Sequence, residues 1–332
     1  MKILTLKDPH INVSHTNRHR VDYGKDIETK WSFINDYCEQ KQVSCIVATG
    51  DVLERNMSKD WSFKAYTRVR NFMYNHVKQL IYTNVGNHDY LDGKYKDTKD
   101  TVFDQLCRDG SLSNISGKRT EYIQGVGIYG INYDHELNEV LDALNEVYEK
   151  ILEEKKSGRI KSAVLISHTT IIPREKLTPI LKDSVHLTYE FLATNYPMID
   201  VHVLGHYHKP EEITRIKDTT FVSPRNMLRM VRDSDVMTDQ FQPQFGILEF
   251  DDGKFVKAEY VDIPFVPYQE AFKIGISDEI NASEARETIA LDFDIDDFKN
   301  NNLTDTELLD IIIKDRELSP EIKDLYDQYY IK

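Results

Sequence analysis

The sequence predicts an α/β sandwich, in which two β-sheets are flanked by helices. Strand-like and helix-like segments alternate over roughly the first 205 residues. Several of the strand-like segments are continuous runs of apolar and β-branched residues, as expected of strands buried on both faces. A β-rich stretch with turn signals follows, up to about residue 263. Together these observations favour layered sheets with helices on their outer faces.

In the first half of the chain, strands and helices are expected in alternation. The helix expected at 26–40 carries Ile27, Trp31, Ile34 and Cys38 at helical spacing. A mixed helical stretch covers roughly 60–76, and a polar loop is expected at 92–101. The strands expected in this half are 2–7, 43–49, 79–85, 120–124 and 126–131.

In the second half, a long helix at 137–152 precedes further strands. Turn signals stand at Lys217-Asp218 and Asp252-Gly253. The strands expected here are 162–167, 200–205, 212–216, 219–223, 245–250 and 254–263.

The chain is expected to divide into a catalytic domain at 1–267 and a small C-terminal α/β or helical appendage at 268–332. Pro264 and Pro267 mark the boundary. In the appendage, Thr304 and Glu307 form a capping box before an apolar run, and Ser319-Pro320 begins a second short helix. We expect this region to be a cap or to bind a partner.

Composition is that of a globular protein, with 40% hydrophobic and 30% charged residues. The N-terminus lacks the pattern of a signal peptide, and no apolar run is long enough to span a membrane. The three cysteines are odd in number and show no metal-binding or disulfide spacing. We therefore expect a reduced, cytoplasmic protein that does not enter a membrane.

The net charge of −14 is unevenly distributed. Residues 277–332 hold 16 Asp and Glu against 6 Lys and Arg, which accounts for −10 of the total. The rest of the chain is close to neutral, so the global charge neither supports nor excludes a nucleic-acid substrate.

Side chains able to bind metal follow five of the expected strands. Ligands in α/β sheets bind at the carboxyl ends of strands, so these side chains should gather at one site. Each motif taken alone is compatible with an ordinary turn, but five of them in chain order argue against a purely structural explanation. The residues concerned are Asp8 and His10, Asp51, Asn87 with His88 and Asp89, His168, and His206 with His208.

This set of donors suits a pair of divalent ions that clamp a phosphoester and activate a water. Mixed His, Asp and Asn ligands fit Mn²⁺, Fe²⁺ or Zn²⁺, and the absence of cysteine ligands argues against a structural zinc site.

The five motifs resemble those of the calcineurin-like metallophosphoesterases, over about residues 1–265. The resemblance implies a four-layer α/β/β/α sandwich with two divalent ions, with Mn²⁺ favoured over Fe²⁺, Zn²⁺ or Mg²⁺. It implies that His88 is the catalytic histidine, stabilising the phosphoryl oxygens and protonating the leaving oxygen, while Asp89 holds it in place. The ligands implied are Asp8, His10, Asp51 and His208 for one ion, and Asp51, Asn87, His168 and His206 for the other.

Within this family, the chain is similar to the nuclease subunit of the bacterial SbcCD complex and to its phage relatives. The segment "FVSPRNMLRM" resembles the Ser-Pro-Gly-Ser-x-x-Arg segment of that group, with Arg225 in place of the glycine. Glu54 stands where the group often has a histidine associated with exonuclease action, and "HINVSH" replaces its usual His-Leu-Gly. These departures favour endonuclease or structure-dependent activity over processive exonuclease activity.

The narrower resemblance implies a DNA substrate, an SbcC-like coiled-coil ATPase as partner, a possible homodimer, and a location in a bacterium or a phage-infected bacterial cell. Arg18, Arg20, Arg225 and Arg229 are candidates for contacts with the phosphate backbone, although they could equally be solvated loop charges.

Two other functions stay open. One is a phosphatase or phosphodiesterase acting on nucleotides or phosphoproteins. A phosphoprotein phosphatase of this family would normally carry an arginine in the Gly-Asn-His segment, and "GNHDYLDG" has none. The other is a binding module that keeps the metal fold without catalysis, which the complete set of ligand positions disfavours.

Overall fold

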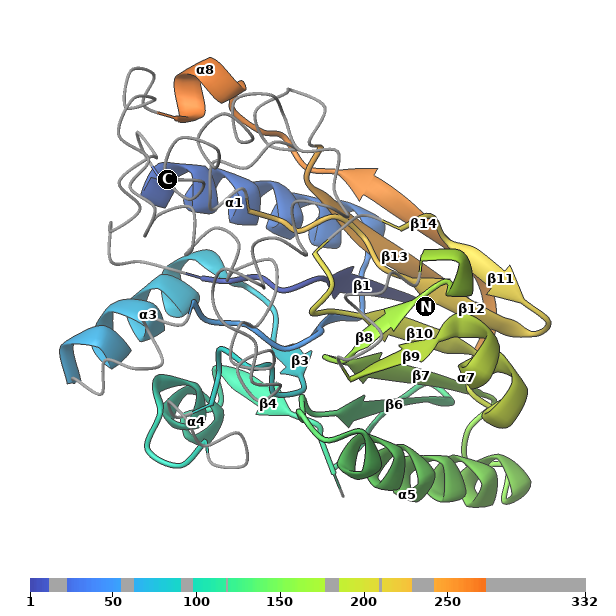
Figure 1. Ribbon diagram of the computed structural model, residues 1–332. Coiled ribbons are helices and arrows are strands. Elements are labelled where there is room, and N and C mark those ends of the chain that lie inside the picture. Colours follow the sequence, from blue (N-terminus) through green and yellow to red (C-terminus); the bar gives the residue numbers. More distant parts are fainter. Residues whose placement is uncertain are drawn as a thin grey trace, which may run out of the picture.

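Two six-stranded sheets pack face to face in the computed structural model (Figure 1). The structure describes residues 1–11, 23–54, 63–90, 98–117, 119–176, 185–208, 211–228 and 242–272. Between the sheets lies an apolar layer that includes Ile3, Val47, Val164 and Val203. Continuous β-branched runs form these strands because both of their faces are buried.

The first sheet has the strand order β14-β13-β1-β2-β3-β4. Its parallel part consists of β1 (Lys2–Leu6), β2 (Cys45–Ala48), β3 (Ile81–Thr83) and β4 (Leu112–Asn114). The hairpin of β13 (Gln244–Asp251) and β14 (Lys254–Asp262) pairs antiparallel with β1. The carboxyl ends of β1, β2 and β3 therefore lie side by side.

The second sheet has the order β11-β12-β10-β7-β6-β5. Its parallel strands are β6 (Val126–Ile131), β7 (Ser162–Ser167), β10 (Val201–Leu204) and β12 (Thr219–Val222). The antiparallel edge strands are β5 (Glu121–Ile123) and β11 (Thr214–Ile216). A separate pair, β8 (Thr170–Ile172) and β9 (His186–Thr188), follows β7 in the chain.

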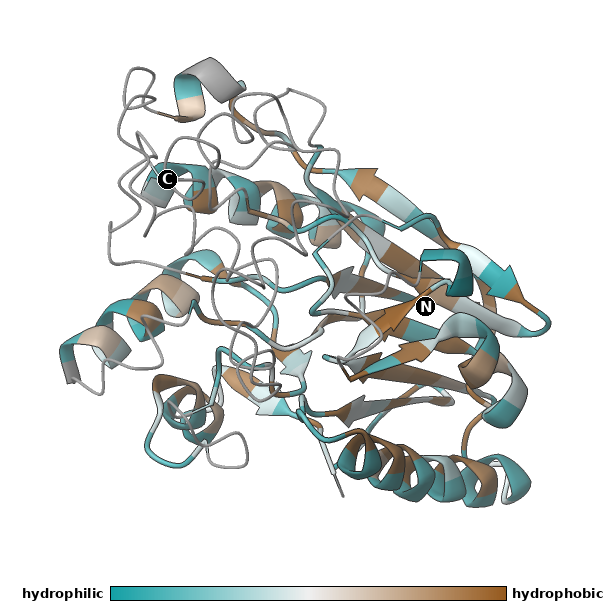
Figure 2. Cartoon of the chain, viewed as in Figure 1, coloured by the Kyte–Doolittle hydropathy of each residue, from teal (hydrophilic) through white to brown (hydrophobic). Residues whose placement is uncertain are grey.

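Helices cover the outer face of each sheet. Residues of α1 (Tyr23–Lys41), α3 (Phe63–His76) and α4 (Val102–Arg108) share a core with the first sheet. Residues of α5 (Leu137–Lys156) and α7 (Tyr189–Asn195) share a core with the second. Figure 2 shows largely apolar strands and helices that carry both polar and apolar residues, as expected of helices with one buried side. The predicted four-layer α/β/β/α sandwich is confirmed.

Some short elements did not follow from the sequence. Helix α4 and strand β4 come directly after the predicted polar loop, and Thr101 caps the helix by accepting a hydrogen bond from the Asp104 amide. Strands β8 and β9, the short 3₁₀ helix at Arg174–Lys176 and helix α7 were also missed. Each has seven residues or fewer, which is too short to show a clear hydrophobic period.

Little of the expected C-terminal appendage belongs to the described part of the chain. Helix α8 (Tyr268–Ala271) and Phe272 are described, whereas the helices expected near 304 and 319 lie outside the described residues. The division at residue 267 therefore stays a prediction. Among the described helices, none is both long enough and apolar enough to cross a membrane.

Candidate metal centre

All seven predicted ligand residues lie at the carboxyl ends of strands from the two sheets. Asp8 and His10 follow β1, Asp51 follows β2, and Asn87 follows β3. His168 follows β7 in the second sheet, and His206 and His208 follow β10. Side chains from the first sheet lie within contact distance of side chains from the second, as His168 does of Asn87 and His208 of Asp8. The site therefore lies where the ends of the two sheets meet.

The backbone at this site is strained. Asp8, His10, Asp51 and His206 have φ values of 40, 44, 43 and 67°. Non-glycine residues rarely adopt these left-handed conformations, and such outliers concentrate at functional sites. The turns that carry the predicted ligands therefore differ from ordinary turns in their strained backbone conformation.

One set of donors gathers around His10. The Nε2 atoms of His10 and His208 are 3.4 Å apart. His208 Nε2 lies 3.6 Å from Asp8 Oδ2, and His10 Nε2 lies 3.8 Å from Asp51 Oδ2. These are the four residues assigned to one ion by the family resemblance.

A second set gathers around His168. Its Nε2 atom lies 2.9 Å from Asn87 Oδ1 and 3.2 Å from Asp51 Oδ2. His206 Nδ1 lies 3.2 Å from the same Asn87 oxygen. Asp51 Oδ2 belongs to both sets, which is the position expected of a carboxylate shared between two ions. The division into two ion sites stays a prediction.

Hydrogen bonds behind the donors fix their orientation. Asp8 Oδ1 accepts from the Thr49 hydroxyl at 2.9 Å, and Asp8 Oδ2 accepts from the His206 amide at 2.9 Å. His168 Nδ1 donates to the Thr49 carbonyl at 2.6 Å, which leaves its Nε2 facing the second donor set. Such outer contacts select the ring tautomer in metal sites.

Two glycines allow the backbone segments to approach this closely. A Cβ atom on Gly205 would lie 2.4 Å from Thr49 Oγ1 and 2.5 Å from Asp8 Oδ1. A Cβ atom on Gly86 would lie 2.0 Å from Asp51 Oδ1. Any larger residue at either position would displace a predicted ligand.

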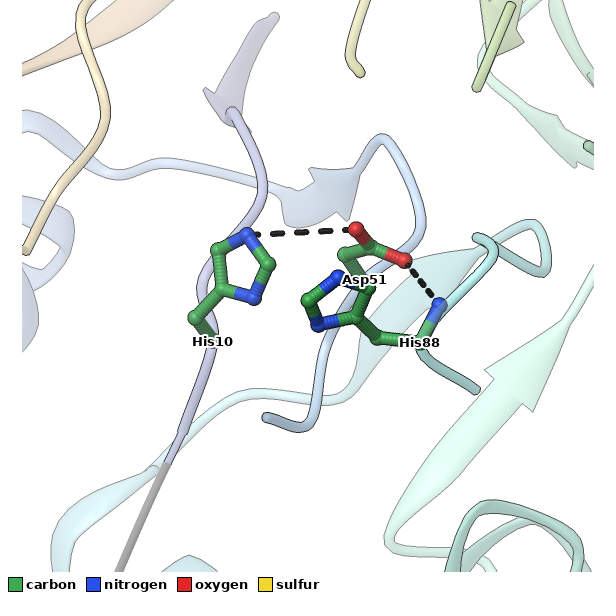
Figure 3. A group of neighbouring side chains, drawn as sticks. All are labelled: His10, Asp51 and His88. Carbon is green, nitrogen blue, oxygen red and sulfur yellow. Dashed lines mark hydrogen bonds and ion pairs between the residues drawn. The ribbon is translucent and has the colours of Figure 1, made fainter. Parts of the chain in front are cut away.

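His88 lies beside the first donor set (Figure 3). Its amide donates to Asp51 Oδ1 at 2.8 Å, and its ring contacts the His10 ring edge-on at 4.9 Å between centroids. Single ligand atoms of His10, Asp51 and His88 all lie within 4.8 Å of one another. His88 thus lies beside the predicted ligands and is close enough to be a ligand itself, and its role as the acid stays a prediction.

Asp89 acts on the backbone of the turn. Its Oδ2 accepts from the Gly86 amide at 3.0 Å, and its Oδ1 accepts from the Leu53 amide at 3.3 Å. Burial and the charge of Asp51 raise the pKa of Asp89 to about 7. These contacts hold the turn of His88 against the loop of Asp51, so Asp89 positions His88 through the main chain.

Two site residues were missed by sequence reasoning. Glu54 is 9% exposed and faces the rings of both His10 and His88. Tyr133 packs beside His206, with ring centroids 5.0 Å apart. Tyr133 stands two residues after β6, so the strand-end rule would have found it if aromatic residues had been considered. In the sequence, Glu54 shows only as a departure from the pattern of the SbcCD group.

The electrostatics of the site suit divalent cations. Burial would raise the pKa of Asp51, but the nearby charges of His168 and His88 hold it well below its usual value. Burial lowers the pKa of His206 and of His208 to about 3, which leaves these imidazoles neutral. Ionised carboxylates and neutral imidazoles are the forms in which these groups bind metals.

The same balance of charge explains His168. Burial would lower its pKa, but the charges of Asp51 and Asp8 raise it well above the usual value. Two buried carboxylates thus draw a positive charge to this position, and a divalent ion between the donors would supply that charge in its place. The residues present therefore fit the two divalent metal ions that the family resemblance implies.

Of the four candidate substrate-binding arginines, Arg225 belongs to the described residues. Arg225 stands three residues after the end of β12, which runs parallel to β10, so it lies at the same carboxyl side of the second sheet as His206. Arg18, Arg20 and Arg229 lie outside the described residues.

The sequence profile of the calcineurin-like phosphoesterases matches residues 1–210. The chain belongs to this family. Calcineurin-like phosphoesterases use a dinuclear divalent site; this chain is a metal-dependent phosphoesterase with a candidate His/Asp metal cluster. No curated protein sequence matches the chain.

Two solved structures with TM-scores of 0.51 and 0.50 support the fold of this calcineurin-like phosphoesterase. The candidate 5′-nucleotidase from Staphylococcus aureus, in complex with alpha-ketoglutarate, is 14% identical with a TM-score of 0.51, and the match covers 87% of this chain and 57% of that one. Calcineurin-like phosphoesterase YfkN from Bacillus subtilis is 16% identical with a TM-score of 0.50, covering 79% and 90%. The 5′-nucleotidase precursor from Thermus thermophilus is 15% identical with a TM-score of 0.48, covering 87% and 59%.

The chain thus spans less than two thirds of the length of both 5′-nucleotidases. At these identities the likeness establishes the fold alone. The narrower similarity to SbcCD nucleases therefore stays a prediction.

Proposed function

We propose that the chain hydrolyses phosphodiester bonds in DNA, as the nuclease subunit of an SbcCD-like recombination or repair complex. The observation that carries the hydrolytic part is the convergence of two donor sets on Asp51 Oδ2, with His88 beside them. Two divalent ions bound there, for which we favour Mn²⁺, would offset charge on the phosphoryl group and activate a water.

The chain's own residues supply the rest of the chemistry. The Nδ1 atom of His88 lies 3.4 Å from Glu54 Oε1, and we assign the transfer of a proton to the other ring nitrogen, Nε2. A proton held at Nε2 can pass to the leaving oxygen as the phosphoester bond breaks. Asp89 fixes the backbone of His88 in this position.

A DNA substrate is supported by the segment that follows β12. Ser223, Pro224 and Arg225 correspond in sequence to the segment shared with SbcCD nucleases, and they lie at the carboxyl side of the second sheet. Arg225 is thereby a candidate contact for a DNA phosphate, together with Arg18, Arg20 and Arg229. An SbcC-like ATPase would supply further DNA-binding surface, with residues 268–332 as its docking region.

The second candidate function is the hydrolysis of nucleotides. It is favoured by the fold shared with the candidate 5′-nucleotidase from Staphylococcus aureus. A nucleotide monoester carries more negative charge than a DNA phosphodiester, so the two substrates make different demands on the site.

The experiment that separates these functions offers the purified chain with Mn²⁺ a set of substrates. The substrates are linear duplex DNA, single-stranded circular DNA, thymidine 5′-monophosphate, a phosphopeptide and bis(p-nitrophenyl) phosphate. Cleavage of the circle and of the diester supports an endonuclease, and release of phosphate from the monoester alone supports the nucleotidase. The Asp51→Asn variant controls for contaminating enzymes, since it should lack every activity that belongs to this site.

A further inference from the structure

Glu54 lies between two imidazoles of the site. Its Oε2 atom is 3.5 Å from His10 Nδ1, and its Oε1 atom is 3.4 Å from His88 Nδ1. Each oxygen of one carboxylate thus faces a different ring. The two rings contact each other edge-on, at 4.9 Å between centroids, so the three side chains form one packed unit.

The backbone leaves Glu54 little freedom. Its amide donates to the Ile11 carbonyl at 3.3 Å, and the His10 amide donates to the Asp51 carbonyl at 2.9 Å. The loops after β1 and β2 are thereby paired, with a bridge between Ile11 and Leu53. Asp89 fixes the Leu53 amide from the other side. The backbone of Glu54 is therefore held by the segments that carry His10 and His88.

The charge of the Glu54 carboxylate biases which nitrogen of each ring carries a proton. A carboxylate facing His10 Nδ1 favours the tautomer with its proton on that nitrogen, which leaves the Nε2 lone pair facing Asp51 and His208. The same carboxylate facing His88 Nδ1 turns the Nε2 end of that ring away from Glu54. A glutamine has the same shape, but its amide can present an acceptor to only one of the two rings.

We propose that Glu54 is a positioning residue that orients His10 and His88 together, so that occupation of the ion site at His10 and the alignment of His88 depend on one carboxylate. This inference rests on the proposed hydrolytic function. It goes further by assigning to a residue outside the predicted ligand set a shared role in metal binding and in proton transfer.

The first test is the binding of Mn²⁺ alone, measured by calorimetry and by elemental analysis on the full chain. Glu54→Gln should weaken one of two Mn²⁺ sites by about 10- to 100-fold, as loss of an outer carboxylate does in other metal sites, and leave the second unchanged. The matched control is Glu154→Gln, because Glu154 is 8% exposed and accepts hydrogen bonds from Tyr122 and Tyr129 at the outer layer. Glu154→Gln should bind both ions as the wild type does.

The second test measures turnover of bis(p-nitrophenyl) phosphate and of a diester with a poorer leaving group, at saturating Mn²⁺. Glu54→Gln should lose more rate on the poorer leaving group, because a misaligned His88 matters most where the leaving oxygen needs a proton. In a His88→Ala background, Glu54→Gln should cause no further loss of rate while still weakening one Mn²⁺ site. A merely structural role for Glu54 would lower the rate equally in both backgrounds.

The outcomes separate this inference from the proposed function. A wild-type chain that binds Mn²⁺ but hydrolyses no substrate overturns the proposed function, and the inference with it. An active wild type with a Glu54→Gln variant of unchanged Mn²⁺ affinity, or of unchanged rate at saturating Mn²⁺, overturns the inference alone. If circular dichroism shows that Glu54→Gln does not fold, Glu54→Asp replaces it in both tests, because the shorter carboxylate cannot reach both rings. Wild-type Mn²⁺ affinity and rate in Glu54→Asp would then refute the inference.

Discussion

His202 gives the fold a dependence on pH that can be measured in isolation. It stands in the middle of β10 with no exposed surface, and its ring stacks on Phe221 at 5.1 Å and 11°. Phe221 in turn stacks on Tyr189 at 4.3 Å and 2°. Among the described residues, neither ring nitrogen of His202 has a hydrogen-bond partner. Burial lowers the pKa of His202 from 6.5 to about 3, so the folded chain keeps this ring neutral.

The sign and size of the effect follow from linkage. Between about pH 6.5 and pH 3 the unfolded chain binds a proton at this position and the folded chain does not, so the free energy of unfolding falls as pH falls. The slope is about 1.4 kcal/mol per pH unit well below 6.5. Integrated from pH 7 to pH 5, His202 alone should remove about 2 kcal/mol of stability.

The measurement compares the wild type with His202→Phe by urea unfolding at pH 7 and pH 5. Phenylalanine preserves the stack on Phe221 and has no titrating nitrogen. The other histidines are common to both proteins, so their contribution cancels in the difference, as does any packing change that does not depend on pH. The variant should lose about 2 kcal/mol less than the wild type between the two pH values. Equal losses in both proteins would refute the conclusion that His202 is buried in its neutral form.

Three further predictions concern the site and the C-terminal region. Asp51→Asn should abolish phosphodiester hydrolysis and lower the bound Mn²⁺ measured by elemental analysis, with an unchanged circular dichroism spectrum; unchanged turnover would remove the two-ion mechanism. His88→Ala should keep both ions and lose about 10²- to 10⁴-fold in rate, less with p-nitrophenol as leaving group, whereas loss of metal would identify His88 as a ligand. Deletion of residues 300–332 should leave hydrolysis of small diesters intact and abolish co-purification with an SbcC-like ATPase; full co-purification would place the partner surface elsewhere.

The layers of the fold could be predicted because a strand buried on both faces is recognisable as a run of apolar residues. The run that forms β7 is buried at every position and apolar between its two terminal serines, since both faces of the strand are covered. Strand β4 shows no such run, because only Leu112 of its three residues is buried. The sequence also could not tell which strands share a sheet, since that depends on pairing between segments far apart in the chain.

The donor side chains could be predicted because strand ends converge in this class of fold. The role of Glu54 could not, because it depends on the close approach of two loops from different strands. The proposed role of Glu54 requires its carboxylate to lie beside the rings of His10 and His88. The backbone pairing of Ile11 with Leu53 brings these residues together. Likewise, the sequence suggested that Asp89 holds His88, but only the structure shows that it does so through backbone amides.

The donor sets straddle the junction between the two sheets. Asp8, Asp51 and Asn87 come from strands of the first sheet, and the three histidines at 168, 206 and 208 come from strands of the second. An ion shared by both groups would therefore be a cross-link between the two halves of the sandwich, at one end of their interface. Chelation would then release the sheets from each other at that end first, and amide exchange at the last residues of β1, β2, β7 and β10 would accelerate before exchange in the rest of the strands. The ions proposed for catalysis would therefore also stabilise the packing of the two sheets.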